Sequence, residues 1–239
     1  ISDLLVGENR PAKEERCLVL ALDLAAQRDD DEDLFRARLF RFAQLARLGR
    51  WTDAEAMWQL LDPMGRDWPR NIYRPGMAEY RYARFRFWQG QLTEEHLAKA
   101  EQLARPGRDR PTVRRLHRLR GAWQLEQGRY APAVDSLHEA VRMAREVGRT
   151  DAEAETQLAI AQFHLKQLPD PREAAEQLAQ AKRPFHRGLA ELWLAIGDHK
   201  QAKHHARKAY EWAWADGEPY VRRYELDKSR ALLEQLGAQ

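Results

Sequence analysis

Strand-forming residues are scarce in this chain of 239 residues. Val, Ile and Thr together occur 16 times, whereas Ala occurs 36 times and Leu 30 times. Ala and Leu have high helix propensity, and β-branched residues favour strands. The composition therefore predicts an all-α fold and excludes both an all-β fold and a doubly wound α/β fold.

Cysteine and long apolar runs are also scarce. The one cysteine, Cys17, cannot form a disulfide within the chain, and its place in the apolar run 17–20 predicts a buried thiol in a reducing cytosol. No apolar stretch approaches the roughly 18 residues that span a bilayer, and no signal-peptide pattern is found. We therefore predict a cytoplasmic protein that does not bind membranes. The first residue is Ile1 rather than Met, and we expect a piece of a longer protein.

The sequence lacks the residue patterns of catalytic, nucleotide and metal sites. Ser136 has no flanking glycines of a nucleophile elbow, and neither Gly-x-x-x-x-Gly-Lys nor Gly-x-Gly-x-x-Gly occurs. His199, His204 and His205 are not spaced to share one helix face, so we expect solvent-exposed histidines rather than metal ligands. The sequence thus predicts no enzyme activity, no cofactor and no metal.

Acidic and basic residues nearly balance, with 40 Lys+Arg against 37 Asp+Glu and a net charge of +3. This excess is too small to indicate nucleic-acid binding by itself. Arg accounts for 32 of the 40 basic residues. An Arg-rich surface suits the bidentate and stacked contacts of interfaces. A genome rich in G and C would produce the same excess, so both explanations stand.

One phrase recurs along the chain: a Gly, an aromatic or apolar residue two positions later, then Ala and further apolar positions at helical spacing. It occurs at 48–54, 127–133 and 196–202, with weaker copies near 89–92 and 168–171. Gly takes the left-handed conformation that ends a helix without strain. Apolar residues three and four apart make the buried stripe of the next helix. Each copy therefore predicts a helical hairpin.

These hairpins make the chain resemble the tetratricopeptide repeat family over about residues 32–215. The residues that carry the resemblance are Gly49, Trp51, Ala54, Trp58, Gly128, Tyr130, Ala133, Leu137, Ala140, Gly197, Ala202, Ala206 and Ala209. The resemblance implies a right-handed α-solenoid that binds other proteins. Gly49, Gly90, Gly128 and Gly197 are 41, 38 and 69 residues apart, whereas the family period is about 34. Longer helices or inserted loops would explain the difference.

The pattern divides the chain into three parts. A helix at 12–27, within residues 1–31, would continue from a preceding repeat, and Pro219 would open a C-terminal capping helix within 218–239. Between them, residues 32–217 would hold about five tetratricopeptide-like hairpins. Their helices are expected at 32–48 with 51–62, 71–89 with 92–105, 111–127 with 130–147, 151–167 with 171–182, and 184–196 with 199–215.

The C-terminal part carries a second resemblance. Residues 209–221 (AYEWAWADGEPYV), together with Tyr224, Leu226, Leu232 and Leu233, resemble the end of the helical-repeat arrays in large bacterial signalling ATPases of the STAND, or NACHT-type, class. In that class the array senses a ligand and an N-terminal effector acts. The resemblance implies a ligand-sensing or scaffold module of a larger bacterial protein. The alternative is a hydrophobic helix junction with Trp212 and Trp214 in the core.

The repeat template points eight side chains into a concave groove. Arginine beside tyrosine and tryptophan is typical of interface hot spots, so this groove predicts binding of another protein or peptide, and an acidic one in particular. The alternative is that the aromatic residues of the set belong to the core. The eight candidate residues are Arg36, Tyr80, Arg84, Trp88, Arg115, Arg118, Arg187 and Glu191.

A basic cluster supports a second hypothesis, a helical repeat domain that binds nucleic acid. Only Asp109 opposes the cluster, which would suit an acidic surface, a peptide or a phosphate backbone. The alternative is a solvated helix edge beside a basic loop. The cluster consists of Arg105, Arg108, Arg110, Arg114, Arg115, Arg118 and Arg120, and His117 adds to it.

Overall fold

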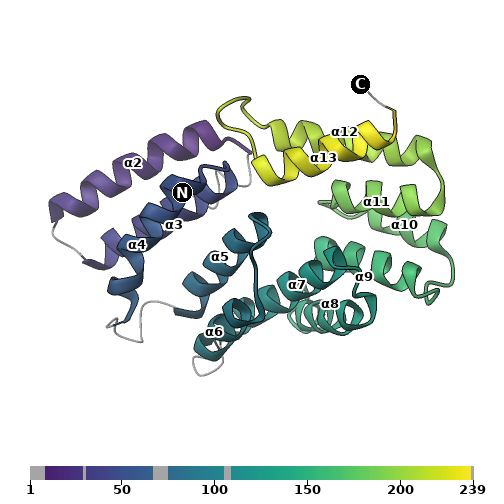
Figure 1. Cartoon of the computed structure of the whole chain (residues 1–239), viewed down its shortest axis with the longest axis horizontal. Coiled ribbons are helices and arrows are strands. Elements are labelled where there is room, and N and C mark those ends of the chain that lie inside the picture. The colour runs from purple at the N-terminus through teal and green to yellow at the C-terminus, as the bar shows by residue number, and fades with distance from the viewer. Residues whose placement is uncertain (1–8, 29–30, 67–74, 105–108, 238–239) are drawn as a thin grey trace.

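A computed structural model of the chain describes residues 9–28, 31–66, 75–104 and 109–237 (Figure 1). Within these residues the secondary structure is helical and contains no strand, which confirms the all-α prediction. The helices are α2 (Pro11–Arg28), α3 (Asp31–Arg47), α4 (Trp51–Arg66), α5 (Pro75–Trp88), α6 (Glu94–Ala104), α7 (Arg110–Glu126), α8 (Tyr130–Arg145), α9 (Ala152–His164), α10 (Pro171–Ala179), α11 (His186–Ile196), α12 (His199–Trp214) and α13 (Arg223–Gln235).

Local signals set the ends of these helices. The carboxylates of Asp151 and Asp198 accept the backbone N–H three residues later and so cap the N-termini of α9 and α12. Gly128 and Gly197 follow α7 and α11 with φ of 69° and 91°, which only glycine adopts without strain. The hairpin boundaries predicted from the recurring glycine are therefore confirmed at these turns.

The helices pack in neighbouring pairs, as in a helical repeat. Successive helices contact each other along the chain, α4 and α5 through the stacked rings of Trp58 and Tyr82, and α3, α5, α7, α9, α11 and α13 also contact one another in sequence. These six helices form an inner row, and α4, α6, α8, α10 and α12 lie outside it (Figure 1). Side chains on the inner row therefore share one face of the molecule.

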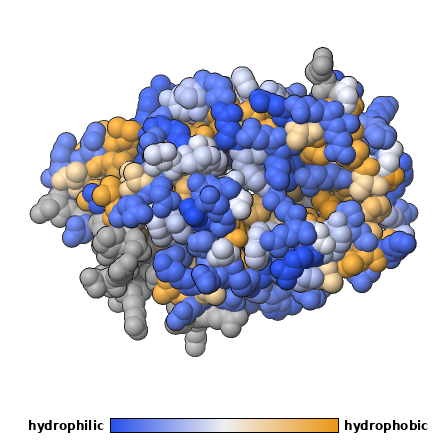
Figure 2. Space-filling model, in the orientation of Figure 1, coloured by the Kyte–Doolittle hydropathy of each residue, from blue (hydrophilic) through white to orange (hydrophobic). Residues whose placement is uncertain are grey.

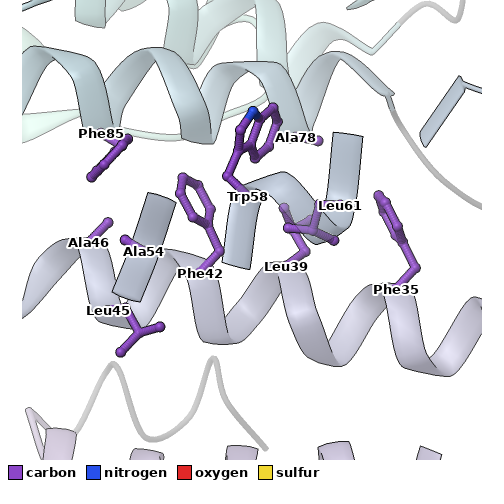
Figure 3. Packing of buried hydrophobic residues seen from close by; sticks show 10 residues of the cluster. All are labelled: Phe35, Leu39, Phe42, Leu45, Ala46, Ala54, Trp58, Leu61, Ala78 and Phe85. Atoms are coloured by element: carbon purple, nitrogen blue, oxygen red, sulfur yellow. The ribbon is translucent and has the colours of Figure 1, made fainter. Parts of the chain in front are cut away.

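One large apolar cluster joins the first two hairpins. Phe42 of α3 lies 5.2 Å from Trp58 of α4 and 5.4 Å from Phe85 of α5, measured between ring centroids (Figure 3). Further along the chain, the alanines of the recurring phrase are fully buried, including Ala133 and Ala202. Their small side chains let paired helices approach closely, as the phrase predicts.

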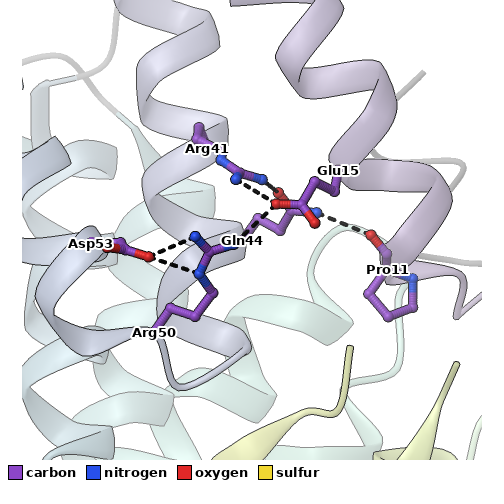
Figure 4. A network of polar contacts seen from close by, with 6 residues as sticks. All are labelled: Pro11, Glu15, Arg41, Gln44, Arg50 and Asp53. Carbon is purple, nitrogen blue, oxygen red and sulfur yellow. Dashed lines mark hydrogen bonds and ion pairs between the residues drawn. The ribbon is translucent and has the colours of Figure 1, made fainter. Parts of the chain in front are cut away.

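A polar network fixes α2 against the first hairpin (Figure 4). Gln44, fully buried, donates to the carbonyl of Pro11 at 3.1 Å. Glu15 accepts from Arg41 at 2.5 Å and from Arg50 at 3.1 Å. Burial raises the pKa of Glu15, but the hydrogen bonds from Arg41 and Tyr220 and the charges of Arg41 and Arg50 together outweigh it and hold that pKa below its ordinary value. The network therefore contributes to stability at neutral pH.

The last helix begins later than predicted. α13 starts at Arg223, four residues after Pro219, which lies in the preceding turn. The backbone N–H of Arg222 donates to the carbonyl of Ala213 at 2.8 Å, and Val221 is buried between Ala213 and Leu226. This burial keeps the segment out of the helix. The prediction that Pro219 opens α13 is wrong.

The two ends of the helix row meet. The side chain of Asn9 donates to the carbonyl of Trp212 and accepts from Nε of Arg222, both at 2.8 Å. The backbone N–H of Ala12, in the first turn of α2, donates to Asp216 at 3.0 Å. Figure 1 shows this end of α2 beside α12 and α13. The first and last described helices are therefore joined.

Two expectations about burial are wrong, and so is one of the alternatives. Cys17 is only partly buried, because α2 packs mainly on α3 and leaves its other flank open. His205 is buried rather than exposed. Trp212 and Trp214 are 47% and 40% exposed, so they do not form a core junction. They lie outside the alanine stripe, from Ala202 to Ala213, that α12 buries.

The surface is mostly hydrophilic in the view of Figure 2, and hydrophobic side chains gather at the end formed by α2. There Val19, Leu20 and Leu24 are exposed on the open flank of α2. Among the described helices, none combines the length and the hydropathy that a membrane crossing requires. The described part of the chain also holds no group of three His, Cys, Asp or Glu side chains arranged to bind a metal.

Candidate functional site

Four of the eight predicted site residues form one cluster on the inner row. Tyr80, on α5, is 4% exposed and packs in the core, as the alternative proposed. Burial raises the pKa of its phenol, but the charges of Arg84, Arg118 and Arg115 outweigh it and hold that pKa below its ordinary value. Arg84 precedes Trp88 by one helical turn on α5, and the other two arginines lie on α7. The structure thus brings together residues of two neighbouring hairpins, as the template predicts.

Arg118 is held in place by carboxylates. Its Nη1 donates to Asp151 at 3.0 Å and lies 3.2 Å from a carboxylate oxygen of Glu153. The side chain of Asp151 is only 6% exposed and also caps α9. Burial lowers the pKa of Arg118, but Glu153, Tyr80 and Asp151 raise it to a net value above the ordinary one. Arg118 therefore joins α7 to α9. Because its positive charge is already balanced by two carboxylates, it is poorly placed to bind an acidic partner.

Arg84 and Arg115 differ from Arg118, because neither forms an ion pair within the described part of the chain. The Arg84 guanidinium lies 4.7 Å from the ring centroid of Trp88, a cation–π distance. Nη1 of Arg115 lies 3.2 Å from the sulfur of Met77, a weak acceptor. Nε of Arg114, on the helix of Arg115, is buried without a hydrogen-bond partner. This part of the inner face is therefore electropositive.

Arg187 and Glu191 lie in a second cluster, on α11, and line a hollow together with Phe87 of α5. Arg187, which is 8% exposed, donates from Nε to Glu225 and from Nη1 to Glu191, both at 2.8 Å. Burial lowers the pKa of Arg187, but Glu225 and Glu191 raise it well above its ordinary value. The pair with Glu225 joins α11 to α13.

The C-terminal helix covers the middle of the predicted groove. The Tyr224 ring, on α13, lies 5.5 Å from Phe87 and 6.4 Å from Trp88, measured between centroids, and its hydroxyl donates to Glu126. Two hollows remain beside α13, of about 400 Å³ and 260 Å³, and both include Phe87, Glu126 and Lys228 in their walls. Trp88 lines the larger hollow and remains half-buried.

Arg36 lies apart from both clusters. It is on α3, its side chain is 47% exposed, and it pairs with Glu32 on the same helix at 2.6 Å. It lines a separate hollow between α2 and α3, together with Cys17 and Phe40. Arg36 therefore shares no contact with the other predicted site residues.

The basic cluster of 105–120 does not form one continuous patch. Arg110 pairs with Glu146, and Arg120 lies 2.8 Å from Glu94 and 3.1 Å from Glu101. The helical turn of α7 directs these arginines to different neighbours. Arg110, Arg118 and Arg120 meet carboxylates there, whereas Arg115 meets the sulfur of Met77. Arg105 and Arg108 lie outside the described residues.

Four residues of this face were not predicted from the sequence. Glu126 and Tyr224 meet across 98 positions of the chain, and Lys228 also pairs with Glu126, at 2.9 Å. Glu225 forms the ion pair with Arg187 that was described above. A contact at such separation leaves no periodic signal. Neither a protein-family model nor a curated protein sequence matches the chain, so its likeness to the tetratricopeptide repeat family rests on the residues quoted above.

Proposed function

We propose that this chain is a protein-binding module whose inner face holds an acidic segment of a partner protein. The observation that carries the proposal is the position of Arg84 and Arg115, which lie on neighbouring helices near the buried Tyr80 and have no carboxylate partner among the residues that the structure describes. Charge-assisted hydrogen bonds between guanidinium and carboxylate are among the strongest available to a protein. A Glu or Asp side chain of the partner would accept such hydrogen bonds from the two arginines.

Trp88 supports the same surface. It is half-buried beneath Arg84 and lines the hollow of about 400 Å³ beside α13. Tryptophan and arginine are the residues most enriched in hot spots of protein interfaces. A partner segment would therefore place an acidic residue between Arg84 and Arg115 and an apolar one against Trp88.

From the sequence we also propose a specific repeat type and a class of parent protein. The recurring Gly-x-aromatic-x-x-Ala phrase supports a right-handed tetratricopeptide-like solenoid with α13 as its capping helix. The segment 209–221 supports a cytoplasmic sensor or scaffold module, without enzyme activity, in a larger bacterial protein of the STAND type. The nucleic-acid alternative at 105–120 has less support, because Arg110, Arg118 and Arg120 are paired with carboxylates.

A fluorescein-labelled peptide rich in Glu and Tyr tests the proposed groove by fluorescence anisotropy. We expect the double variant Arg84→Gln/Arg115→Gln to weaken binding at least tenfold, because each lost charged hydrogen bond is worth about 1.5–3 kcal/mol. The matched control is Arg16→Gln/Arg28→Gln, which removes two exposed charges from α2. Binding of the double variant within twofold of the parent, or an equal loss in the control, would refute the proposal.

A further inference from the structure

A concentration of positive charge without carboxylate partners in the described residues lies on the outer helix α12 and in the segment that precedes α11. Residues 199–210 contain no Asp or Glu. Between 182 and 208 the only acidic residues are Glu191 and Asp198, which pair with Arg187 and Arg172. Six cations of this segment have no carboxylate partner within the residues that the structure describes. They are Lys182, Arg183, Lys200, Lys203, Arg207 and Lys208.

The geometry of α12 turns this charge outward. The helix buries one stripe, from Ala202 through Ala206 to Ala213, against α11 and α13. Lys200, Arg207 and Lys208 are exposed, and Lys203 is half-exposed. Side chains three and four positions apart on a helix are neighbours, with Cβ atoms roughly 5–6 Å apart. The cations of α12 therefore form a row along its solvent-facing side.

The cations of α12 are aligned in a row without nearby carboxylates on the same helix segment. Some exposed arginines elsewhere have carboxylate partners, as in the pairs of Arg36 with Glu32 and of Arg142 with Glu139, and others, such as Arg16, form no ion pair within the described residues. Lysine is also enriched in this segment. Four of the chain's eight lysines lie between 182 and 208, whereas most basic residues of the chain are arginines. Like charges three and four positions apart destabilise a helix. An anionic ligand would offset that repulsion.

We propose that the outer face of α12 binds the phosphate backbone of a nucleic acid. Lysine is a compact point charge that suits phosphate, and it is depleted at protein–protein interfaces. A helix that lies on a membrane surface needs apolar side chains beside its cations, but the apolar stripe of α12 is buried along residues 202–213, and the exposed Trp212 and Trp214 lie beyond the cation row of 200–208. A phosphate chain requires only the row of cations. This site lies on an outer helix and is independent of the inner-face groove.

The test measures binding of a fluorescein-labelled DNA duplex of random sequence by anisotropy, as a function of salt. Four phosphate contacts predict a decrease in affinity of about 100-fold between 50 and 200 mM salt. The variant Lys200→Gln/Lys203→Gln/Arg207→Gln/Lys208→Gln should bind at least tenfold more weakly at 100 mM salt and show a flatter salt dependence. Circular dichroism melting verifies that the variant is folded.

The matched control, Arg16→Gln/Arg28→Gln/Arg129→Gln/Lys166→Gln, removes four exposed charges elsewhere and has the same net charge. We expect it to bind DNA within about twofold of the parent. Equal losses in both quadruple variants would overturn the proposal, because binding would then follow net charge alone. Binding of phosphatidylserine vesicles through the same four residues, without binding of DNA, would also overturn it. The variant Arg84→Gln/Arg115→Gln should leave DNA binding unchanged, which separates this test from that of the groove.

Discussion

Arg187 and Glu225 form a largely buried ion pair between α11 and α13, with Nε of Arg187 2.8 Å from a carboxylate oxygen of Glu225. The two side chains are 10% and 19% exposed. The Arg187 guanidinium also lies 5.6 Å from the ring centroid of Tyr224, one residue before Glu225. One buried arginine of α11 therefore contributes both an ion pair and a cation–π contact to the covering of the groove by α13.

Replacing Arg187 with Gln should loosen α13. The change leaves the carboxylate of Glu225 without its cation, and breaking a buried pair in this way costs about 3–5 kcal/mol. We expect a lower melting temperature and faster amide hydrogen exchange over 223–235. Glu191→Gln is the control, because it keeps the pair with Glu225 and should cost less than about 1 kcal/mol. Unchanged exchange in α13 after Arg187→Gln would show that other contacts hold the helix.

Arg118 should prove to be a structural residue. Arg118→Gln removes the cation that faces the buried Asp151, and we expect a loss of about 2–4 kcal/mol in the free energy of unfolding, measured with urea. Arg115→Gln, three positions earlier on the same helix, removes no ion pair and should change stability by less than about 0.5 kcal/mol. Equal stability of the two variants would contradict the assigned difference between these arginines.

Gly49 offers a test of the joint between the chain's two ends. Gly49 and Gly90 have φ of 73° and 69°, so alanine at either position costs about 1–2 kcal/mol in backbone strain. A Cβ at Gly49 would also lie 2.5 Å from Cβ of Arg223, whereas one at Gly90 would meet no atom within 4 Å. We expect Gly49→Ala to be more destabilising than Gly90→Ala by about 1–3 kcal/mol. Equal melting temperatures would argue against the contact with Arg223.

The buried alanines of α12 should not tolerate larger side chains. Ala202 and Ala206, both on α12, are fully buried. Ala202 packs on α11, and Ala206 packs on α11 and α13. Leucine at either position overpacks this seam and should cost about 1–3 kcal/mol. Ala98→Leu is the matched control, since Ala98 is exposed on α6. The melting temperatures of the three variants test this prediction. If both α12 variants melt at the temperature of the parent, the side chains of Ala202 and Ala206 are not closely packed.

Acid should destabilise the contact between α11 and α12. The Nδ1 atoms of His186 and His205 lie 2.9 Å apart. Burial, and the nearby charges of His186, His204 and Lys208, lower the pKa of His205 to about 4, and burial also lowers the pKa of His186. The ordinary histidine pKa in an unfolded chain is about 6.5.

The unfolded state therefore binds more protons than the folded state between about pH 4 and 6.5, and stability must fall as the pH decreases through this window. After allowance for solvent screening we expect a loss of about 1–2 kcal/mol between pH 7.5 and 5. The double variant His186→Gln/His205→Gln should lose less stability over this range. An equal pH dependence of the variant and the parent would assign the effect to other groups.

Local sequence signals predicted the helices well, because the glycine at a helix end and the spacing of buried alanines act within a few residues. Gly128, Gly197 and Ala202 are found in the expected roles. The same signals could not predict that Val221 is buried and delays α13, since its partner Ala213 is brought near only by the turn between them.

The candidate site shows the same division. The repeat template placed Arg84 and Arg115 on neighbouring helices, because neighbouring hairpins stack side by side. It could not show that Arg118 faces Asp151, 33 residues away, or that Arg187 faces Glu225, 38 residues away. Such pairs depend on how far each helix is rotated and shifted against the next, and a single sequence contains no measure of either.

The joint between Asn9, Trp212 and Arg222 has a consequence for how the array can evolve. In an open array each unit touches only its neighbours, so a unit can be gained or lost while the others stay as they are. Here the first and last described helices share hydrogen bonds, so a deleted or duplicated hairpin would pull these partners out of reach. The number of hairpins between them is thereby fixed. The hydrogen bonds between the two ends must also break before the array can extend, whereas an open array can extend without breaking any contact between its ends.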